Sequence, residues 1–269
     1  MSEVSNRDKS LVQQQFGAHA QEYATSVVHA KGASLARLVE LVQPQPDWVV
    51  LDVATAAGHT AFAFAPHVAQ VIATDITPEM LPVAANVAAE KGITNVALET
   101  ADAEDLPYDN GIFDLVTCRI APHHFPHVER FVAECYRVLK PGGTVAVVDN
   151  VVPGSRTDDA AGAAQRTAGA VINDFEKQRD PSHGRCLSVA DWLALFDQAG
   201  FQLLQQETAP KRMLFDPWVK RMGASPATQA NLRNVLLNAT GEVAAFFRPQ
   251  ADGDDLAFHL LEAIFIGRK

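Results

Sequence analysis

The first clear pattern along the chain is an apolar stripe near the N-terminus. Apolar side chains recur there at spacings of three and four residues, which is typical of one face of a helix. These are Leu35, Leu38, Val39 and Val42. Pro44 and Pro46 end the pattern, and residues 1–30 before it are polar and rich in glutamine and alanine. We therefore expect residues 1–46 to form an N-terminal helical cover.

From residue 47 to residue 150 the pattern changes to short, continuous apolar runs. They are WVVLDV, VIATD, VALET, FDLVTCR and TVAVVDN, and segments with helical spacing separate them. Such runs are typical of strands that are buried on both faces of a parallel sheet, and the alternation with helices is typical of an α/β fold. Residues 47–150 are therefore the predicted core of a doubly wound sheet, and we expect a cofactor site on it.

Turn and cap residues place several helix ends. Thr77, Pro78 and Glu79 look like an N-cap, a proline at the first helical position and an acid in the first turn. Lys91 and Gly92 then predict the C-terminal end of that helix.

The same reasoning applies further along the chain. Lys140–Gly143 predicts the end of a helix that starts near Val128. Ser188, with Asp191 three residues later, predicts the start of another helix, and Gly200 predicts its end.

The rest of the chain divides into core and lid segments. Residues 188–209 are predicted as a core helix and strand, and residues 254–269 as a final core strand. Residues 151–187 and 210–253 are expected to be helical and to form a lid. These two segments carry Phe175, Phe215, Trp218, Phe246 and Phe247. The predicted fold is a seven-stranded, mostly parallel sheet, in which a reversed sixth and seventh strand follow five parallel strands.

Composition and charge narrow the function classes. The chain of 269 residues has a formal net charge of -10. An acidic balance disfavours nucleic acids and anionic membrane surfaces as partners. The three cysteines lack a C-x-x-C pair, and no stretch is apolar enough for a signal or a membrane span. We expect a cytoplasmic protein without stable membrane association, and the sequence leaves a homodimer open.

The loop after the first strand carries the strongest functional signal. In VVLDVATAAGHTAFAFA a strand passes through small residues directly into a helix, a turn that requires little or no side chain. About 20 residues later, Asp75 ends the second strand, where a carboxylate accepts hydrogen bonds from the ribose hydroxyls of an adenosine. The pair predicts an adenosine-cofactor site, although a strand-to-helix turn packed with small residues for its own sake is the structural alternative.

The alanines of this loop indicate which cofactor it binds. An alignment to G-x-G-x-x-G gives Ala56, Gly58 and Ala61, which retains one glycine of three. Extra methyl groups would interfere with the diphosphate of a dinucleotide. S-adenosylmethionine has no phosphate, and its cationic sulfonium is compatible with an acidic protein.

Several motifs together resemble the class I S-adenosylmethionine-dependent methyltransferases. Within that class the chain is similar to the small-molecule group that includes the ubiquinone and menaquinone C-methyltransferases, over about residues 10–207. The motifs are LDVATAAGHT, ATDITPEM, TADAEDLPYDNGIFDLVTCR and RVLKPGGTVAVVD.

The resemblance implies roles for individual residues. Asp52, Thr55 and Gly58 would shape the methionine end of the site, and Asp75 would bind the ribose. Ile76 would lie against the adenine. The full set implied as cofactor-binding is Tyr23, Asp52, Ala54, Thr55, Gly58, His59, Asp75, Ile76, Met80, Asp102, Ala103 and Arg119.

Two positions of the loop after the first strand depart from the family pattern. Ala54 and Ala56 stand where the family usually has glycine. We expect them to occupy those positions without strain, because alanine is strained there only if its φ is positive.

The histidines after the fourth strand are the candidate catalytic residues. His123 and His124 follow FDLVTCR directly, at the edge of the sheet where open α/β folds bind ligands. An imidazole there has a pKa suited to a general base, and packing or helix capping is the structural alternative. The H-H-x-x-H run has no carboxylate or cysteine in local sequence, so no metal site is predicted.

These arguments predict methyl transfer from S-adenosylmethionine to a small, apolar or aromatic molecule. An NAD-dependent oxidoreductase shares the strand, the turn and the ribose acid, but the missing glycines disfavour it. A non-catalytic methyltransferase-like binding or scaffold protein is the second alternative, because of the same alanines.

Overall fold

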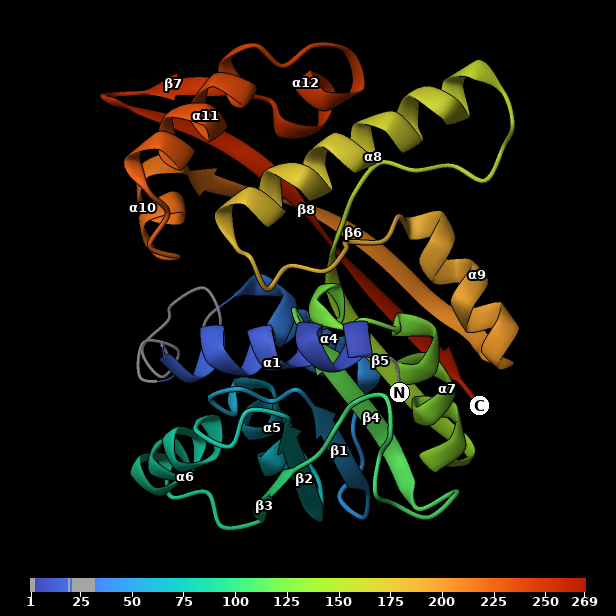
Figure 1. Ribbon diagram of the computed structural model, residues 1–269. Helices are drawn as coiled ribbons and strands as arrows, with labels where there is room; N and C mark the ends of the chain where they lie inside the picture. Colours follow the sequence, from blue (N-terminus) through green and yellow to red (C-terminus); the bar gives the residue numbers. More distant parts are fainter. Residues whose placement is uncertain (1–2, 19, 21–31) are drawn as a thin grey trace. The chain divides into compact units, whose positions relative to one another are not determined.

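The computed structural model describes residues 3–18, 20 and 32–269 (Figure 1). The α-helices are α1 (Glu3–Ala18), α4 (Ala33–Val42), α5 (His59–Phe64), α6 (Met80–Lys91), α7 (Val128–Val138), α8 (Ala160–Arg179), α9 (Val189–Ala199), α10 (Phe215–Lys220), α11 (Pro226–Leu237) and α12 (Gly241–Phe247). The 3-10 helices are η1 (Ala65–His67) and η2 (Pro122–His124). Within these described ranges, no helix is both long and apolar enough to cross a membrane.

The strands form one mixed sheet. They are β1 (Val49–Val53), β2 (Gln70–Asp75), β3 (Val96–Thr100), β4 (Phe113–Arg119), β5 (Leu139–Val151), β6 (Gln202–Leu214), β7 (Gln250–Asp252) and β8 (Asp255–Arg268). Their order is β3-β2-β1-β4-β5-β8-β6, and β7 pairs antiparallel with β8. The first five strands in that order pair in parallel, so their carboxyl ends lie at the same edge. The predicted α/β fold class is confirmed, and the short β7 is an additional strand.

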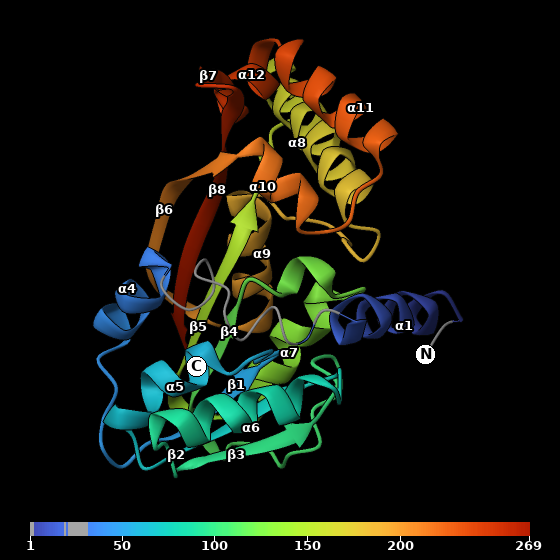
Figure 2. The ribbon, with the colours of Figure 1, turned by 90° about the vertical axis from the view of Figure 1, so that its left-hand side faces the viewer.

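Helices cover both faces of this sheet. A buried apolar cluster joins α4, α5 and α6 to β1, β2, β4, β5 and β8, which includes Ile264 and Ile266. Phe265, between those two isoleucines, packs against Phe196 of α9 with ring centroids 6.0 Å apart. Because side chains alternate across a strand, α9 covers the opposite face of β8. Figure 2 shows α7 on the same side as α9, and α4 and α5 on the other side.

The helix ends test the cap predictions individually. The box at Ser188 is confirmed, because its Oγ accepts the Asp191 amide at 3.1 Å. Gly92 and Gly200 end their helices with positive φ, as expected. The N-cap at Thr77 is wrong, because Asp75 accepts the Thr77 amide and α6 begins only at Met80.

Two predicted boundaries also move. The helix that begins at Val128 ends at Val138, before Lys140–Gly143, and β5 already includes that segment. Residues 210–214, predicted as part of a helical lid segment, continue β6 instead. Where the last residues of a strand are exposed, the sequence shows no apolar pattern over them. It therefore gives no local signal for where the strand ends.

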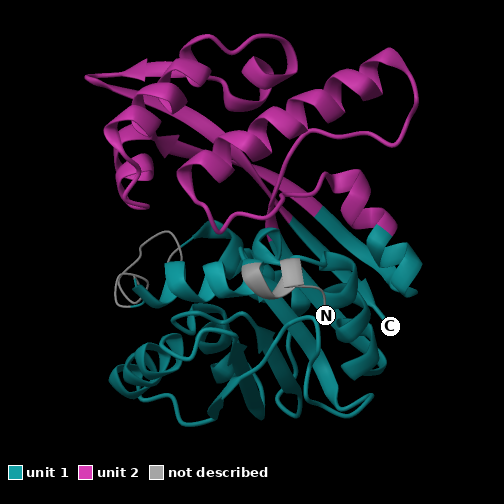
Figure 3. Ribbon diagram, viewed as in Figure 1, with its two compact units in different colours: residues 1–148, 195–206, 264–269 teal, residues 149–194, 207–263 magenta. Residues whose placement is uncertain are grey.

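The chain divides into two compact units (Figure 3). Unit 1 comprises residues 1–148, 195–206 and 264–269, and unit 2 comprises residues 149–194 and 207–263. Strands β5, β6 and β8 therefore each contribute residues to both units. The sequence instead assigned residues 188–209 and 254–269 wholly to the core, because local patterns do not show how a long strand is shared.

Unit 2 has its own aromatic core. Phe175 of α8 stacks on Trp218 of α10 with ring centroids 5.0 Å apart, and Phe247 and Phe258 complete the cluster. Trp218 is 1% exposed, and its indole nitrogen has no hydrogen-bond partner within the described residues. Ring packing rather than polar contacts holds this cluster together.

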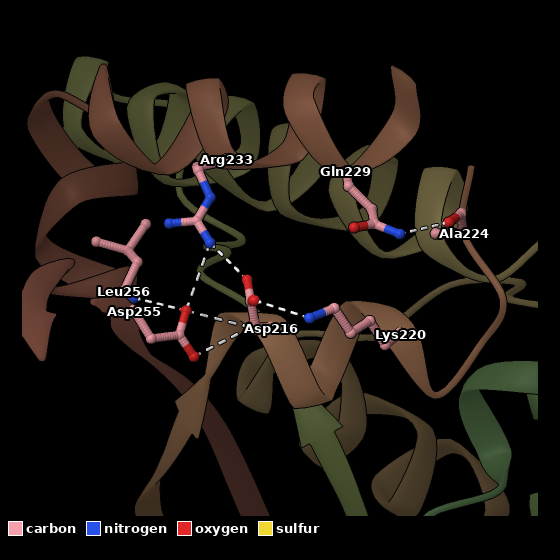
Figure 4. A network of polar contacts seen from close by, with 7 residues as sticks. All are labelled: Asp216, Lys220, Ala224, Gln229, Arg233, Asp255 and Leu256. Atoms are coloured by element: carbon pink, nitrogen blue, oxygen red, sulfur yellow. Dashed lines mark hydrogen bonds and ion pairs between the residues drawn. The ribbon is translucent and has the colours of Figure 1, made fainter. Parts of the chain in front are cut away.

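A polar network fastens α10 and α11 to the start of β8 (Figure 4). Arg233 Nη2 lies 2.6 Å from Asp216 Oδ1 and 3.4 Å from Asp255 Oδ1. Asp216 also pairs with Lys220 at 2.9 Å, and the Arg233 guanidinium lies 4.6 Å from the centre of the Phe215 ring. The network thus places a guanidinium over Phe215, a member of the buried apolar cluster of unit 2.

Candidate active site

Asp52 lies at the carboxyl end of β1 and organises the loop that follows. Its Oδ2 accepts Thr55 Oγ1 at 2.6 Å and the Ala61 amide at 3.2 Å, and its Oδ1 accepts Thr117 Oγ1 at 2.7 Å. Burial raises the pKa of this carboxyl to about 6, although these hydrogen bonds and the charge of Arg119 oppose the shift. One carboxylate therefore joins β1, the loop, α5 and β4.

The loop between β1 and α5 has a left-handed backbone at alternate residues. Ala54, Ala56 and Gly58 have φ values of 55°, 47° and 84°. A Cβ on Gly58 would lie 2.3 Å from the ring of Phe62, so glycine is required there by space as well as by φ. The expectation that the two alanines are unstrained is wrong, because the loop imposes positive φ on both.

Asp75 ends β2 and holds the same loop from the other side. Its Oδ2 accepts the Ala56 amide at 2.9 Å, and its Oδ1 accepts the Thr77 amide at 2.8 Å. Burial raises the pKa of Asp75, and the backbone hydrogen bonds oppose that shift. These amides fix the position of the carboxylate at the sheet edge.

A lysine of α1 meets the acidic segment that follows β3. Lys9 Nζ lies 2.6 Å from Asp102 Oδ2 and 2.7 Å from Glu104 Oε2. Glu104 also accepts the His127 amide at 2.7 Å, and its side chain is 2% exposed. The sequence did not identify Lys9 or Glu104 as site residues, although the spacing of about two helical turns between Lys9 and Phe16 was an available signal.

The segment after β4 brings a buried cation and two imidazoles to the same edge. Arg119 is buried and its Nε donates to Ser34 Oγ of α4 at 3.3 Å. Ile120 has a φ of 55°, which is rare for a β-branched residue. Such strain persists only where surrounding structure fixes the backbone, and its amide donates to the Val148 carbonyl at 2.7 Å.

The rings of His123 and His124 lie beside α1. Their centroids are 4.3 Å apart, and the His124 ring meets the Phe16 ring edge-on at 4.9 Å. His123 is buried, and His124 is partly exposed. Phe16 also packs on the small apolar cluster formed by Ala57, Met80 and their neighbours. Helix α1 therefore contacts both the β1 loop and the segment after β4.

The structure thus brings most of the predicted residues to one sheet edge. Asp52, Asp75 and Arg119 end or nearly end three adjacent parallel strands, and the β1 loop lies between two of them. His59 is the first residue of α5, and Ile76 accepts a hydrogen bond from Gln13 of α1. Ala103 is buried beside Asp102. Tyr23 lies outside the described residues.

Comparisons with known proteins point to one family. Residues 51–147 match a family model described as a methyltransferase domain. YcgJ, an uncharacterized methyltransferase of Bacillus subtilis, is 34% identical over 255 residues, which cover 93% of this chain and 96% of YcgJ. A Bacillus halodurans protein of known structure is 35% identical, with a TM-score of 0.80 over 88% of this chain and 99% of that chain. The ubiquinone/menaquinone biosynthesis C-methyltransferase UbiE of Brucella canis is 39% identical over 103 residues, 37% of this chain and 38% of UbiE.

Proposed function

Because the chain belongs to the class I S-adenosylmethionine-dependent methyltransferases, we propose that it transfers the methyl group of this cofactor to a small, apolar or aromatic molecule. The observation that carries the proposal is the cluster of Phe16, His123 and His124 at the cofactor edge of unit 1. Such a ring cluster suits the flat or apolar surface of a small acceptor. The oxidoreductase and scaffold alternatives are not favoured, since the relative that matches nearly the whole chain is a methyltransferase.

The residues at the sheet edge fit the cofactor. The carboxylate of Asp75 already accepts the Ala56 and Thr77 amides, and the two ribose hydroxyls would approach the same carboxylate. Gly58 leaves its own position in the loop free of side-chain atoms, and Asp102 offers a carboxylate for the amino group of adenine. Asp52, Ala54, Thr55 and His59 would border the methionine part, together with the backbone around Arg119.

The protein's own contribution to the reaction is chiefly positioning. When bound, S-adenosylmethionine supplies an activated methyl group, and displacement by a nucleophile in line needs only correct geometry. For a protonated acceptor, His123 or His124 would remove the proton as general base. The strained backbone at Ile120 fixes the point from which this segment leaves β4.

Binding of S-adenosylhomocysteine tests the cofactor site. We expect this product to raise the melting temperature where NAD does not. Asp75→Ala should weaken its binding by about 30-fold to 150-fold, or about 2–3 kcal/mol, because a charge-assisted contact to two hydroxyls is lost. Calorimetry measures the change. The matched control is Glu99→Ala on the adjacent strand, whose exposed carboxylate accepts the Tyr108 hydroxyl. Equal affinity in wild type and Asp75→Ala would contradict the ribose role.

Methyl transfer tests the acceptor class and the base. We would supply cofactor with a labelled methyl group to a set of hydroquinones, catechols and aliphatic acids, and measure label extracted into organic solvent. With the best acceptor, His123→Ala or His124→Ala should lower the single-turnover rate by about 10²-fold to 10⁴-fold between pH 5.5 and 8.5. His127→Ala is the matched control, because its ring faces Glu129 instead. Wild-type rates and pH profiles in both variants would refute the base.

A further inference from the structure

Helix α1 presents three contacts along one face. Lys9, Gln13 and Phe16 are spaced by four and three residues, so they lie on the same side of the helix. Lys9 reaches Asp102 and Glu104, Gln13 donates to the Ile76 carbonyl at 2.8 Å, and Phe16 meets His124. The two ends of this face therefore touch two different loops at the carboxyl edge of the sheet.

Lys9 occupies the charged end of that face. Its side chain is 12% exposed, and it lies within ion-pair distance of two carboxylates. Burial alone lowers the pKa of Lys9, but the contacts with Asp102 and Glu104 outweigh burial and raise its pKa above the usual value. The ammonium is therefore charged at any physiological pH, and one positive charge serves two negative ones.

Glu104 connects this ammonium to the segment that carries the histidines. Its Oε2 lies at Lys9, while its Oε1 accepts the amide of His127, the residue just before α7. Asp102 in turn accepts the Glu104 amide at 3.0 Å through Oδ1. Lys9, Asp102, Glu104 and His127 thus form a continuous polar chain from α1 to the end of the segment that begins at Ile120.

We propose that Lys9 is a positioning residue, whose single ammonium fixes the adenine carboxylate Asp102 and, through Glu104, the segment 120–127 beside the methyl acceptor. The inference rests on the proposed adenine role of Asp102. Lys9 itself need not touch substrate or cofactor. Without it, two carboxylates face each other without a counter-charge, and one of them is almost completely buried. The pair then separates, and both loops and α1 lose their fixed positions together.

The charge balance dictates the test. Lys9→Met removes the ammonium and keeps most of the alkyl chain, whereas Lys9→Met combined with Glu104→Gln removes one charge of each sign. We expect Lys9→Met to weaken S-adenosylhomocysteine binding by about 10-fold or more. The double variant should recover at least about half of that loss on a logarithmic scale, because the uncompensated buried carboxylate is gone. Lys91→Met, at an exposed position of α6, should leave affinity unchanged.

Hydrogen exchange of the cofactor-free protein supplies a second measurement. In Lys9→Met, amides of residues 102–105 and 122–128 should exchange faster than in wild type, and the double variant should slow the exchange at residues 102–105 again. The single variant Glu104→Gln completes the comparison. Unchanged affinity and unchanged exchange in Lys9→Met would overturn the proposal, as would a double variant whose loss of affinity equals the product of the losses in Lys9→Met and Glu104→Gln. If wild type fails to bind S-adenosylhomocysteine, the proposed function fails, whereas normal wild-type binding with an unaffected Lys9→Met refutes the positioning role alone.

Discussion

The carboxyl edge of the sheet in unit 1, where we propose that the cofactor binds, and the aromatic core of unit 2 are built on different principles. At this edge, the buried carboxylates of Asp52 and Asp75 hold the loop whose backbone is left-handed at Ala54 and Ala56. In unit 2, Phe175, Trp218 and their neighbours are held by ring contacts. In the first region a strained backbone with fixed polar contacts lowers the stability of the fold, and in the second region the burial of apolar rings raises it. Substitutions in the two regions should therefore affect different measurements.

Removing the central ring of unit 2 should give the largest change in stability. Trp218→Ala leaves a cavity beside Phe175 and also removes the ring under the Arg179 guanidinium, so we expect a loss of about 3–5 kcal/mol in unfolding free energy. Urea unfolding measures the loss, and calorimetry on the folded fraction should give nearly wild-type affinity for S-adenosylhomocysteine.

A surface leucine of the same unit is the matched control for that variant. Leu237, at the end of α11, is 65% exposed, so Leu237→Ala should change stability by less than about 0.5 kcal/mol. The comparison between the two regions breaks down if Trp218→Ala weakens cofactor binding as strongly as Asp75→Ala does.

The pH dependence of stability tests the buried carboxylate Asp52 of unit 1. The pKa of Asp52 is about 6 in the folded protein, against an ordinary value of 3.8, so the folded state binds a proton that the unfolded chain has released. The contribution of Asp52 to the free energy of unfolding is therefore most favourable below about pH 4. It is lost as the pH rises through 6, and it does not change further at higher pH. The difference in unfolding free energy between wild type and Asp52→Asn should fall by about 2 kcal/mol from pH 4 to pH 7, and by about 3 kcal/mol over the whole titration.

Urea unfolding of both proteins at each pH gives this difference. The pH dependence caused by the other carboxyl groups is the same in both proteins and cancels in the difference. Asparagine at position 52 does not titrate, so its own effect on packing is the same at every pH. A difference that stays flat across the series would mean that Asp52 ionises normally in spite of its burial.

The smallest expected change concerns the strained alanines. Ala54→Gly and Ala56→Gly relieve a positive φ, but glycine also gains freedom in the unfolded chain, so the net gain in unfolding free energy should reach at most about 1 kcal/mol. Cofactor affinity should stay within about threefold, because the amide of residue 56 still donates to Asp75.

The control for these variants is the same substitution where φ is helical. Ala85→Gly, at an exposed position inside α6, should lower stability by about 0.5–1 kcal/mol. If Ala56→Gly lowers stability as much as Ala85→Gly does, the left-handed backbone of the loop carries no strain. Thermal or urea unfolding shows whether each substitution raises or lowers the stability.

The alternation of strands with helices and the residues near the strand ends were predictable, because both depend on local signals. A short apolar run marks a buried strand, and the polar residue that ends it must lie at the edge of a parallel sheet. Asp52 and Asp75 were placed at this edge in this way, and His123 was placed there because it closely follows the fourth strand. Cap residues were less dependable, since Thr77 looks like an N-cap but its amide is taken by Asp75.

The sequence by itself determined the fold class and the family, and it predicted the sheet edge at which we propose the site, because periodicity and motif spacing are properties of neighbouring residues. Only the tertiary structure decided the backbone of Ala54 and Ala56, which Asp75 and the start of α5 impose on the loop together. It also decided the pairing of Lys9 with Asp102, 93 residues away, and of Arg119 with Ser34, 85 residues away. Such partners meet only after the strands have taken their order, so no local pattern of hydrophobic and polar residues encodes them.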